Sequence, residues 1–115
     1  MSASTLELST TQARQLEERW VKMRSHKRAV ASRCFLLEWE EGGKRCCANA
    51  ITVDVSHSGC MAVVGADIPL HREVQLVLPE TGRCARGVVV WRGHEAWDTG
   101  IAFVEPDASF WGVNI

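Results

Sequence analysis

The chain has 115 residues, a formal net charge of −1 and a hydrophobic content of 46%, which predict one globular domain built around a single core. The nearly neutral charge excludes a polycation that binds nucleic acid over its whole surface. No apolar run approaches the roughly 20 residues that span a bilayer, and the polar start "MSASTLELSTTQ" lacks the pattern of a secretory signal.

Residues 9–23 have the periodicity of a helix. Ser9 and Gln12 are spaced as a capping box, in which each side chain satisfies a backbone N–H group of the first turn. One apolar stripe then recurs at intervals of three and four residues: Ala13, Leu16, Trp20 and Met23. We therefore expect residues 1–23 to form a polar tail and an amphipathic α-helix, which packs on its own domain or joins two copies in a homodimer.

After Arg28 the pattern changes to short β-strands, so we expect a β-barrel domain over residues 24–115 with a short C-terminal tail. The apolar runs are "VASRCFLLEW", "RCCANAITVDV", "GCMAVVG", "REVQLVLP", "RCARGVVVWR" and "GIAFVE". Gly42 and Gly43 predict a hairpin turn between the first two runs, and "DASFW" near the end predicts one helical turn. Regular spacing with turn signals predicts an all-β antiparallel barrel or sandwich with a flanking helix.

The five cysteines are Cys34, Cys46, Cys47, Cys60 and Cys84. No pair has the Cys-x-x-Cys spacing, which argues against a zinc ribbon. The cysteines in "RCC" and "GRCARG" are typical of buried or half-buried thiols in strands. Free thiols in odd number predict a reducing, cytoplasmic location.

A basic segment precedes the first strand. Residues 19–33 contain six Lys or Arg residues and no acid, which predicts a local site for an anion. Within it Arg24 and Arg28 are four residues apart. A guanidinium pairs bidentately with phosphate and with the O6 and N7 acceptors of guanine. Alone, such a pair is better explained as a solvated basic helix end.

The stretch "DVSHSG" stands between two apolar strands. The two oxygens of Asp54 can accept from the N1–H and N2 amine donors of guanine. The Ser56 hydroxyl lies two residues on, hence on the same face of a strand, and Gly59 leaves room for a flat ligand. A plain turn capped by Asp and Ser explains this stretch alone, but both motifs together predict a receptor for guanine and phosphate.

Arg24-Ser-His-Lys-Arg28 followed by Asp54-Val-Ser56-His-Ser-Gly59 resembles the signature of the PilZ domain, a bacterial receptor module for cyclic di-GMP. "VVVWRG" and "DTGIAF" resemble the last two strands of that family, so the likeness covers about Arg24 to Glu105. It implies a six-stranded antiparallel β-barrel and no catalytic residue, metal or cofactor. It also implies that Arg24 and Arg28 hold phosphates and guanine edges, that Asp54 and Ser56 contact guanine, and that Gly59 shapes the loop.

These expectations describe a binding switch: the dinucleotide orders the segment "RSHKRAVASR", moves the preceding helix and alters the surface offered to a protein effector. DNA, RNA and a membrane span are not expected. Two other functions stay open. One is an interaction module of the same fold that ignores nucleotides and acts through Trp20 or "FWGVNI". The other is a small hydrolase using His57, Cys60 or His94, although these residues lack ligand spacing and an orienting partner.

Overall fold

A computed structural model describes residues 18, 28–93, 97–113 and 115. These residues form seven strands and no helical element: β1 Ala29–Val30, β2 Cys34–Glu41, β3 Lys44–Ser56, β4 Gly59–Val64, β5 Glu73–Val77, β6 Cys84–Arg92 and β7 Asp98–Phe103. Apart from Glu18, the predicted helix over residues 9–23 lies outside the described residues, as does the domain boundary at residue 23.

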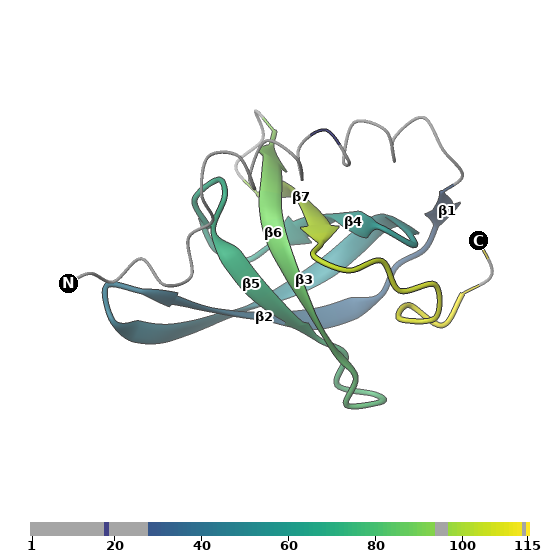
Figure 1. Cartoon of the computed structure of the whole chain (residues 1–115), viewed down its shortest axis with the longest axis horizontal. Helices are drawn as coiled ribbons and strands as arrows, with labels where there is room; N and C mark the ends of the chain where they lie inside the picture. The colour runs from purple at the N-terminus through teal and green to yellow at the C-terminus, as the bar shows by residue number, and fades with distance from the viewer. Residues whose placement is uncertain (1–17, 19–27, 94–96, 114) are drawn as a thin grey trace.

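Six of the strands close into an antiparallel barrel (Figure 1). The order β3-β2-β5-β6-β7-β4 returns to β3 through a β3–β4 pairing, and β1 flanks β3 outside this ring. All pairings are antiparallel. The predicted six-stranded antiparallel barrel is therefore confirmed, with one short strand added.

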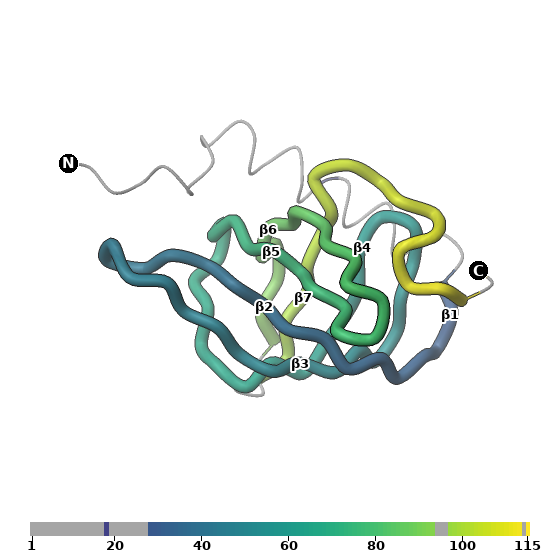
Figure 2. Tube along the Cα trace, turned by 90° about the horizontal axis from the view of Figure 1, so that it is seen from below, coloured from purple at the N-terminus to yellow at the C-terminus, as the bar shows by residue number. Residues whose placement is uncertain are grey.

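The β2–β3 hairpin follows the predicted turn. Its turn residues Gly42 and Gly43 have φ angles of 60° and 82°, which glycine adopts without steric cost. Register runs without a break from Glu41 opposite Lys44 to Cys34 opposite Ile51. Figures 1 and 2 both show this hairpin projecting beyond the rest of the barrel.

One predicted strand is wrong in its continuity. The run "VASRCFLLEW" divides into β1 and β2, because residues 31–33 leave the ladder. The cause is Thr52 of β3, whose side chain satisfies the backbone that the ladder does not. The Thr52 hydroxyl donates to the Ala31 carbonyl at 2.5 Å and accepts from the Arg33 N–H at 2.7 Å.

The core fills the barrel and is closed by the chain's last turn. The predicted inward stripe of β5 and the residue beyond it is confirmed, since Val74, Leu76 and Leu78 are all buried. Trp111 stacks on Phe103 with ring centroids 5.9 Å apart. Residues 107–112 form hydrogen-bonded turns in place of the predicted helical turn, because the Phe110 and Gly112 N–H groups each donate to the carbonyl three residues back, at 3.5 and 3.2 Å.

The cysteines differ partly from expectation. All five are free; Cys60 is buried and Cys46 half-buried, but Cys47 and Cys84 are exposed, as is Cys34. Alternation explains Cys47, which directly follows the inward-facing Cys46 and so points outward. Cys84 opens β6, where the barrel wall begins, and is likewise uncovered.

Candidate functional site

A β-bulge puts Asp54 on the outer face of the barrel. Thr52 pairs with Ala62 and Asp54 pairs with Met61, so two residues of β3 face one residue of β4. Thr52 and Val55 are both buried, at 2% and 0% exposure, although they are three positions apart in the strand. An unbroken strand would have aimed Asp54 inward with Thr52; the extra residue reverses the alternation and keeps the carboxylate out of the core.

Arg28 reaches Asp54 because β1 pairs with the end of β3. Val30 lies opposite Asp54 and Ala29 opposite Val55, which brings the preceding arginine to the same corner. The Arg28 Nη1 to Asp54 Oδ2 distance is 3.5 Å, across 26 residues of sequence. The side chains are 31% and 18% exposed, so the ion pair is only partly screened by water.

The second oxygen of Asp54 accepts no hydrogen bond from the residues that the structure describes. This oxygen, Oδ1, is buried. A buried carboxylate oxygen without a donor is costly, by about 1–3 kcal/mol or more when charged. The carboxylate therefore keeps one acceptor for which the described residues supply no donor.

Ser56 and Gly59 form the turn after β3. Ser56, the last residue of β3, pairs with Gly59, the first residue of β4. The Ser56 hydroxyl accepts from the Ser58 N–H at 3.1 Å. Ser56 is 3% exposed. Accepting this bond leaves the hydroxyl proton for another acceptor, so Ser56 caps the turn and still has a donor.

Gly59 cannot be another residue without movement of the backbone. Its φ is 148°, and a Cβ there would lie 2.0 Å from the Ile101 carbonyl oxygen of β7. Its own carbonyl accepts from the Trp111 indole N–H at 3.3 Å. The predicted loop-shaping role is thus a close approach between β4 and β7, with the C-terminal turn fastened to the same point.

The structure brings together four of the five predicted site residues. Arg28 and Asp54 are in contact, and Ser56 at the end of β3 and Gly59 at the start of β4 flank the turn that follows. Arg24 lies outside the described residues.

Thr52 and Arg33 were missed by sequence reasoning. The Thr52 hydroxyl hydrogen-bonds the backbone of residues 31 and 33 and so fixes where β1 meets β3. The Thr52 N–H also donates to the Arg33 carbonyl at 3.0 Å, and Arg33 Nε is buried with no partner in the described part of the chain. A threonine inside "NAITVDV" reads as an ordinary strand residue, so no local signal marks it.

The structure argues against Cys60 as the nucleophile of a hydrolase. Cys60 is fully buried, and burial, with a smaller contribution from the charge of Asp54, raises the pKa of its thiol far above the usual value. The thiol therefore stays protonated and inaccessible at neutral pH. Among the residues that the structure describes, no group of three or more His, Cys, Asp or Glu side chains is placed to hold a metal.

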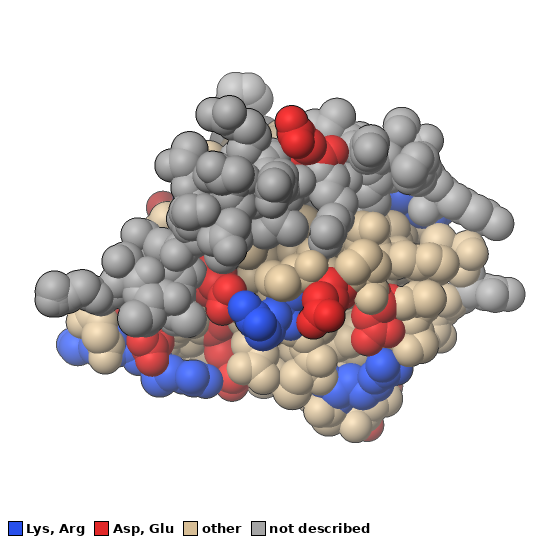
Figure 3. All heavy atoms as spheres, viewed as in Figure 1, with Lys and Arg blue, Asp and Glu red and all other residues tan. Residues whose placement is uncertain are grey.

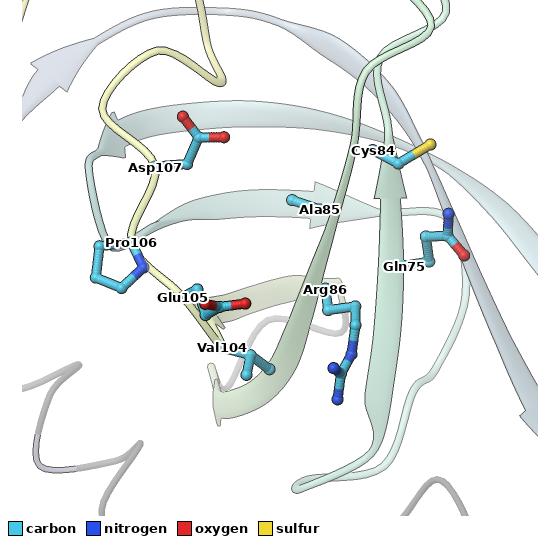
Figure 4. Close-up of a pocket in the computed structure, with 8 residues that line it drawn as sticks. All are labelled: Gln75, Cys84, Ala85, Arg86, Val104, Glu105, Pro106 and Asp107. Carbon is cyan, nitrogen blue, oxygen red and sulfur yellow. The ribbon is translucent and has the colours of Figure 1, made fainter.

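A cleft of about 450 Å³ lies elsewhere, between β5, β6 and the segment after β7 (Figure 4). Arg86 and Glu105 are among its lining residues, and the hydrogen bond from Arg86 to Glu73, at 2.9 Å, raises the pKa of that guanidinium. None of the predicted site residues lines this cleft. On the face in Figure 3, basic and acidic side chains lie beside one another among the described atoms.

No family model, curated protein or solved structure matches this chain. Within residues 28–93 and 97–113, no helix is long and apolar enough to cross a membrane.

Proposed function

We propose that the chain is a cyclic di-GMP receptor of the PilZ type, in which Arg28, Asp54 and Ser56 bind the dinucleotide on the outer face of the barrel. Arg24 completes the set as a second guanidinium from the preceding segment. Binding alters the segment that leads into β1 and thereby the surface presented to a protein effector.

One observation carries the proposal: Arg28 and Asp54 meet at 3.5 Å, while Asp54 Oδ1 is buried and has no hydrogen-bond donor among the described residues. Guanine offers two adjacent N–H donors on one edge, which match the two oxygens of one carboxylate. A guanidinium beside it supplies the charge for a phosphate or for the O6 and N7 edge. The site thus holds complementary groups for both parts of a guanine nucleotide.

Ligand binding competes with the internal ion pair. Arg28 has to turn from Asp54 toward phosphate or share the carboxylate with guanine, and either change alters the start of β1. Because β1 is two residues long, little ladder resists that change. This is the physical basis for a switch at the junction of residue 28 with the barrel.

The test is isothermal titration of the full chain with cyclic di-GMP, with GMP as the control ligand. We expect saturable heat with the cyclic dinucleotide and a stoichiometry of one or two ligands per chain. Arg28→Ala should weaken binding by about 10- to 100-fold, the usual effect of losing a charged hydrogen-bonding partner. No heat from the unmodified chain at about 100 μM protein contradicts the proposal.

Arg45→Ala is the matched control. Arg45 also pairs with an acid, Glu38, at 3.1 Å, but it lies on the β2–β3 hairpin and is far more exposed than Arg28. Its replacement should leave the affinity unchanged. Equal weakening in both variants indicates a nonspecific charge effect and removes Arg28 from the site.

A second function, an interaction module of this fold that does not bind nucleotide, is favoured by the self-sufficiency of the turn. Ser56 already caps Ser58, and Arg28 already neutralises Asp54. A flat titration with both nucleotides, from a protein shown to be folded, selects this function.

A further inference from the structure

A second apolar cluster lies outside the barrel core. It consists of Met61, Val88, Val90, Ala102 and Val104, from β4, β6, β7 and the residue after β7. Val88 and Ala102 are 0% exposed and Val90 is 6% exposed. We call these five residues the outer-face cluster.

Alternation shows that the cluster points away from the barrel interior. Val89 and Ile101 pair with each other and belong to the interior core. Val88 and Ala102, the next pair along the same two strands, therefore face outward. Val90 lies two residues beyond Val88 on β6, so the same alternation aims it outward.

The covering layer is not among the described strands. Every substantial strand–strand contact in the described part of the chain runs along the barrel ladder, between neighbours in the sheet. Two adjacent outward side chains at 0% exposure nevertheless require atoms above them.

We infer that residues 9–23 are the occupant and that their stripe of Ala13, Leu16, Trp20 and Met23 packs on the outer-face cluster. The other undescribed segments are residues 94–96 and 114, which are too short to form a layer. The N-terminal segment has both the length and an apolar stripe that matches an apolar surface.

The chain before β1 is long enough for residues 9–23 to reach the outer-face cluster. β1 joins β3, and β4, β7 and β6 follow β3 in order around the barrel. Three strand intervals of about 4.8 Å place β6 about 14 Å from β3. Residues 24–27 span about 13 Å when extended, and a helix of 15 residues is about 22 Å long. The helix can therefore lie across β4, β7 and β6.

This docking site borders the candidate nucleotide site, because Met61 lies opposite Asp54 in the β3–β4 ladder. It does not depend on nucleotide binding. It assigns a resting position to the N-terminal segment whether or not the chain binds a nucleotide.

Limited trypsin digestion of the full chain, without nucleotide, tests the inference by the rate of cleavage after Arg19 and Lys22. Val90→Asp puts a charge into the cluster and should speed cleavage at least tenfold while the barrel stays folded by circular dichroism. Val63→Asp is the matched control, because Val63 also points outward but is 40% exposed; it should change the rate less than twofold.

Trp20→Ser alters the proposed interface on the side of the N-terminal segment. It tests the inference independently if Val90→Asp fails to fold. It should accelerate cleavage to a similar degree. Unchanged cleavage in Trp20→Ser with a folded barrel overturns the inference. A cleavage rate that rises on dilution, with a dimer in sedimentation, also overturns it by assigning the occupant to a second copy of the chain.

Discussion

Two parts of the barrel's outer surface have similar composition and opposite exposure. On one, Val88 and Ala102 are fully buried; on the other, Ile51 and Val63 pair across β3 and β4 and are 41% and 40% exposed. The second part lines an open apolar hollow of about 600 Å³. Strand alternation aims both sets outward, so the difference comes from what lies above each. An outward-facing apolar residue therefore indicates an exposed apolar surface only where no other part of the protein packs over it.

The site residues lie at the border between these two surfaces. Asp54 is next to the exposed Val53 on its own strand and opposite Met61 of the outer-face cluster. A ligand at Asp54 would therefore have open surface on one side and a covered surface on the other. The effects of substitutions near this border are therefore interpreted by comparing the covered surface with the open one.

The largest effect is expected at Gly59, on the covered side. Gly59→Ala places a Cβ 2.0 Å from the Ile101 carbonyl and should lower the free energy of unfolding by on the order of 3 kcal/mol, because β4 and β7 must separate. Urea denaturation measures it. Gly43→Ala, where φ is 82° but no atom lies within 4 Å, should cost only about 1 kcal/mol. Equal costs would show that the close approach is not a constraint.

A direct comparison of the two surfaces follows. Val88→Ala should lower the free energy of unfolding by about 2 kcal/mol, because two buried methyl groups are lost and a cavity remains. Val63→Ala on the open side should cost less than about 1 kcal/mol. Chemical denaturation of both variants in the full chain gives the difference. If Val63→Ala costs as much as Val88→Ala, the two surfaces are equally covered and the comparison is wrong.

A smaller effect is expected at Thr52, which fixes the chain where β1 and β2 separate. Thr52→Val keeps the shape but removes the hydroxyl that bonds Ala31 and Arg33, so two half-buried backbone groups lose this partner. We expect a loss of about 1–2 kcal/mol, measured by thermal or urea unfolding. Thr52→Ser retains the hydroxyl and is the control; it should recover most of the loss.

The smallest effect is expected at Asp107 in the C-terminal turn. Hydrogen bonds from the Ser109 N–H and hydroxyl, each 3.0 Å, and the nearby Arg83 lower the pKa of this carboxyl. A lowered folded-state pKa stabilises the fold above the usual carboxyl pKa of about 4, and the contribution disappears as pH falls through the folded-state value. Asp107→Asn should be less stable than the unmodified chain near pH 6, and the gap should narrow near pH 2.5. A gap independent of pH would exclude the carboxylate as its cause.

The sequence predicts the barrel well, because alternation and turn chemistry are local. Val74 and Leu76 show their inward stripe directly, and Gly42 and Gly43 mark the hairpin. The break between β1 and β2 was not predictable in this way. It depends on the hydroxyl of Thr52 meeting residues about 20 positions away, and no local pattern carries that information.

The candidate site is predicted in composition but not in arrangement. Asp54, Ser56 and Gly59 were identified from side-chain chemistry, and their place on one strand end and turn agrees with that expectation. Their orientation was assumed from an unbroken strand. The bulge that sets the orientation has no signature in "AITVDV", because its cause is the pairing with β4. The outer-face cluster was missed for a related reason: "GVVVW" has no period that separates inward from outward residues.

The bulge in β3 has a consequence for protein engineering. The bulge adds one residue to the side-chain alternation: even-numbered residues up to Thr52 face inward, whereas beyond the bulge Val55 does. Deleting Val53 would remove the extra residue together with the bulge, so Asp54 would follow Thr52 directly and still face outward, and Val55 would still face inward. A transplant of this motif into another barrel therefore has to match the number of preceding residues to the strand pairing, since the six letters alone do not encode the side on which they act.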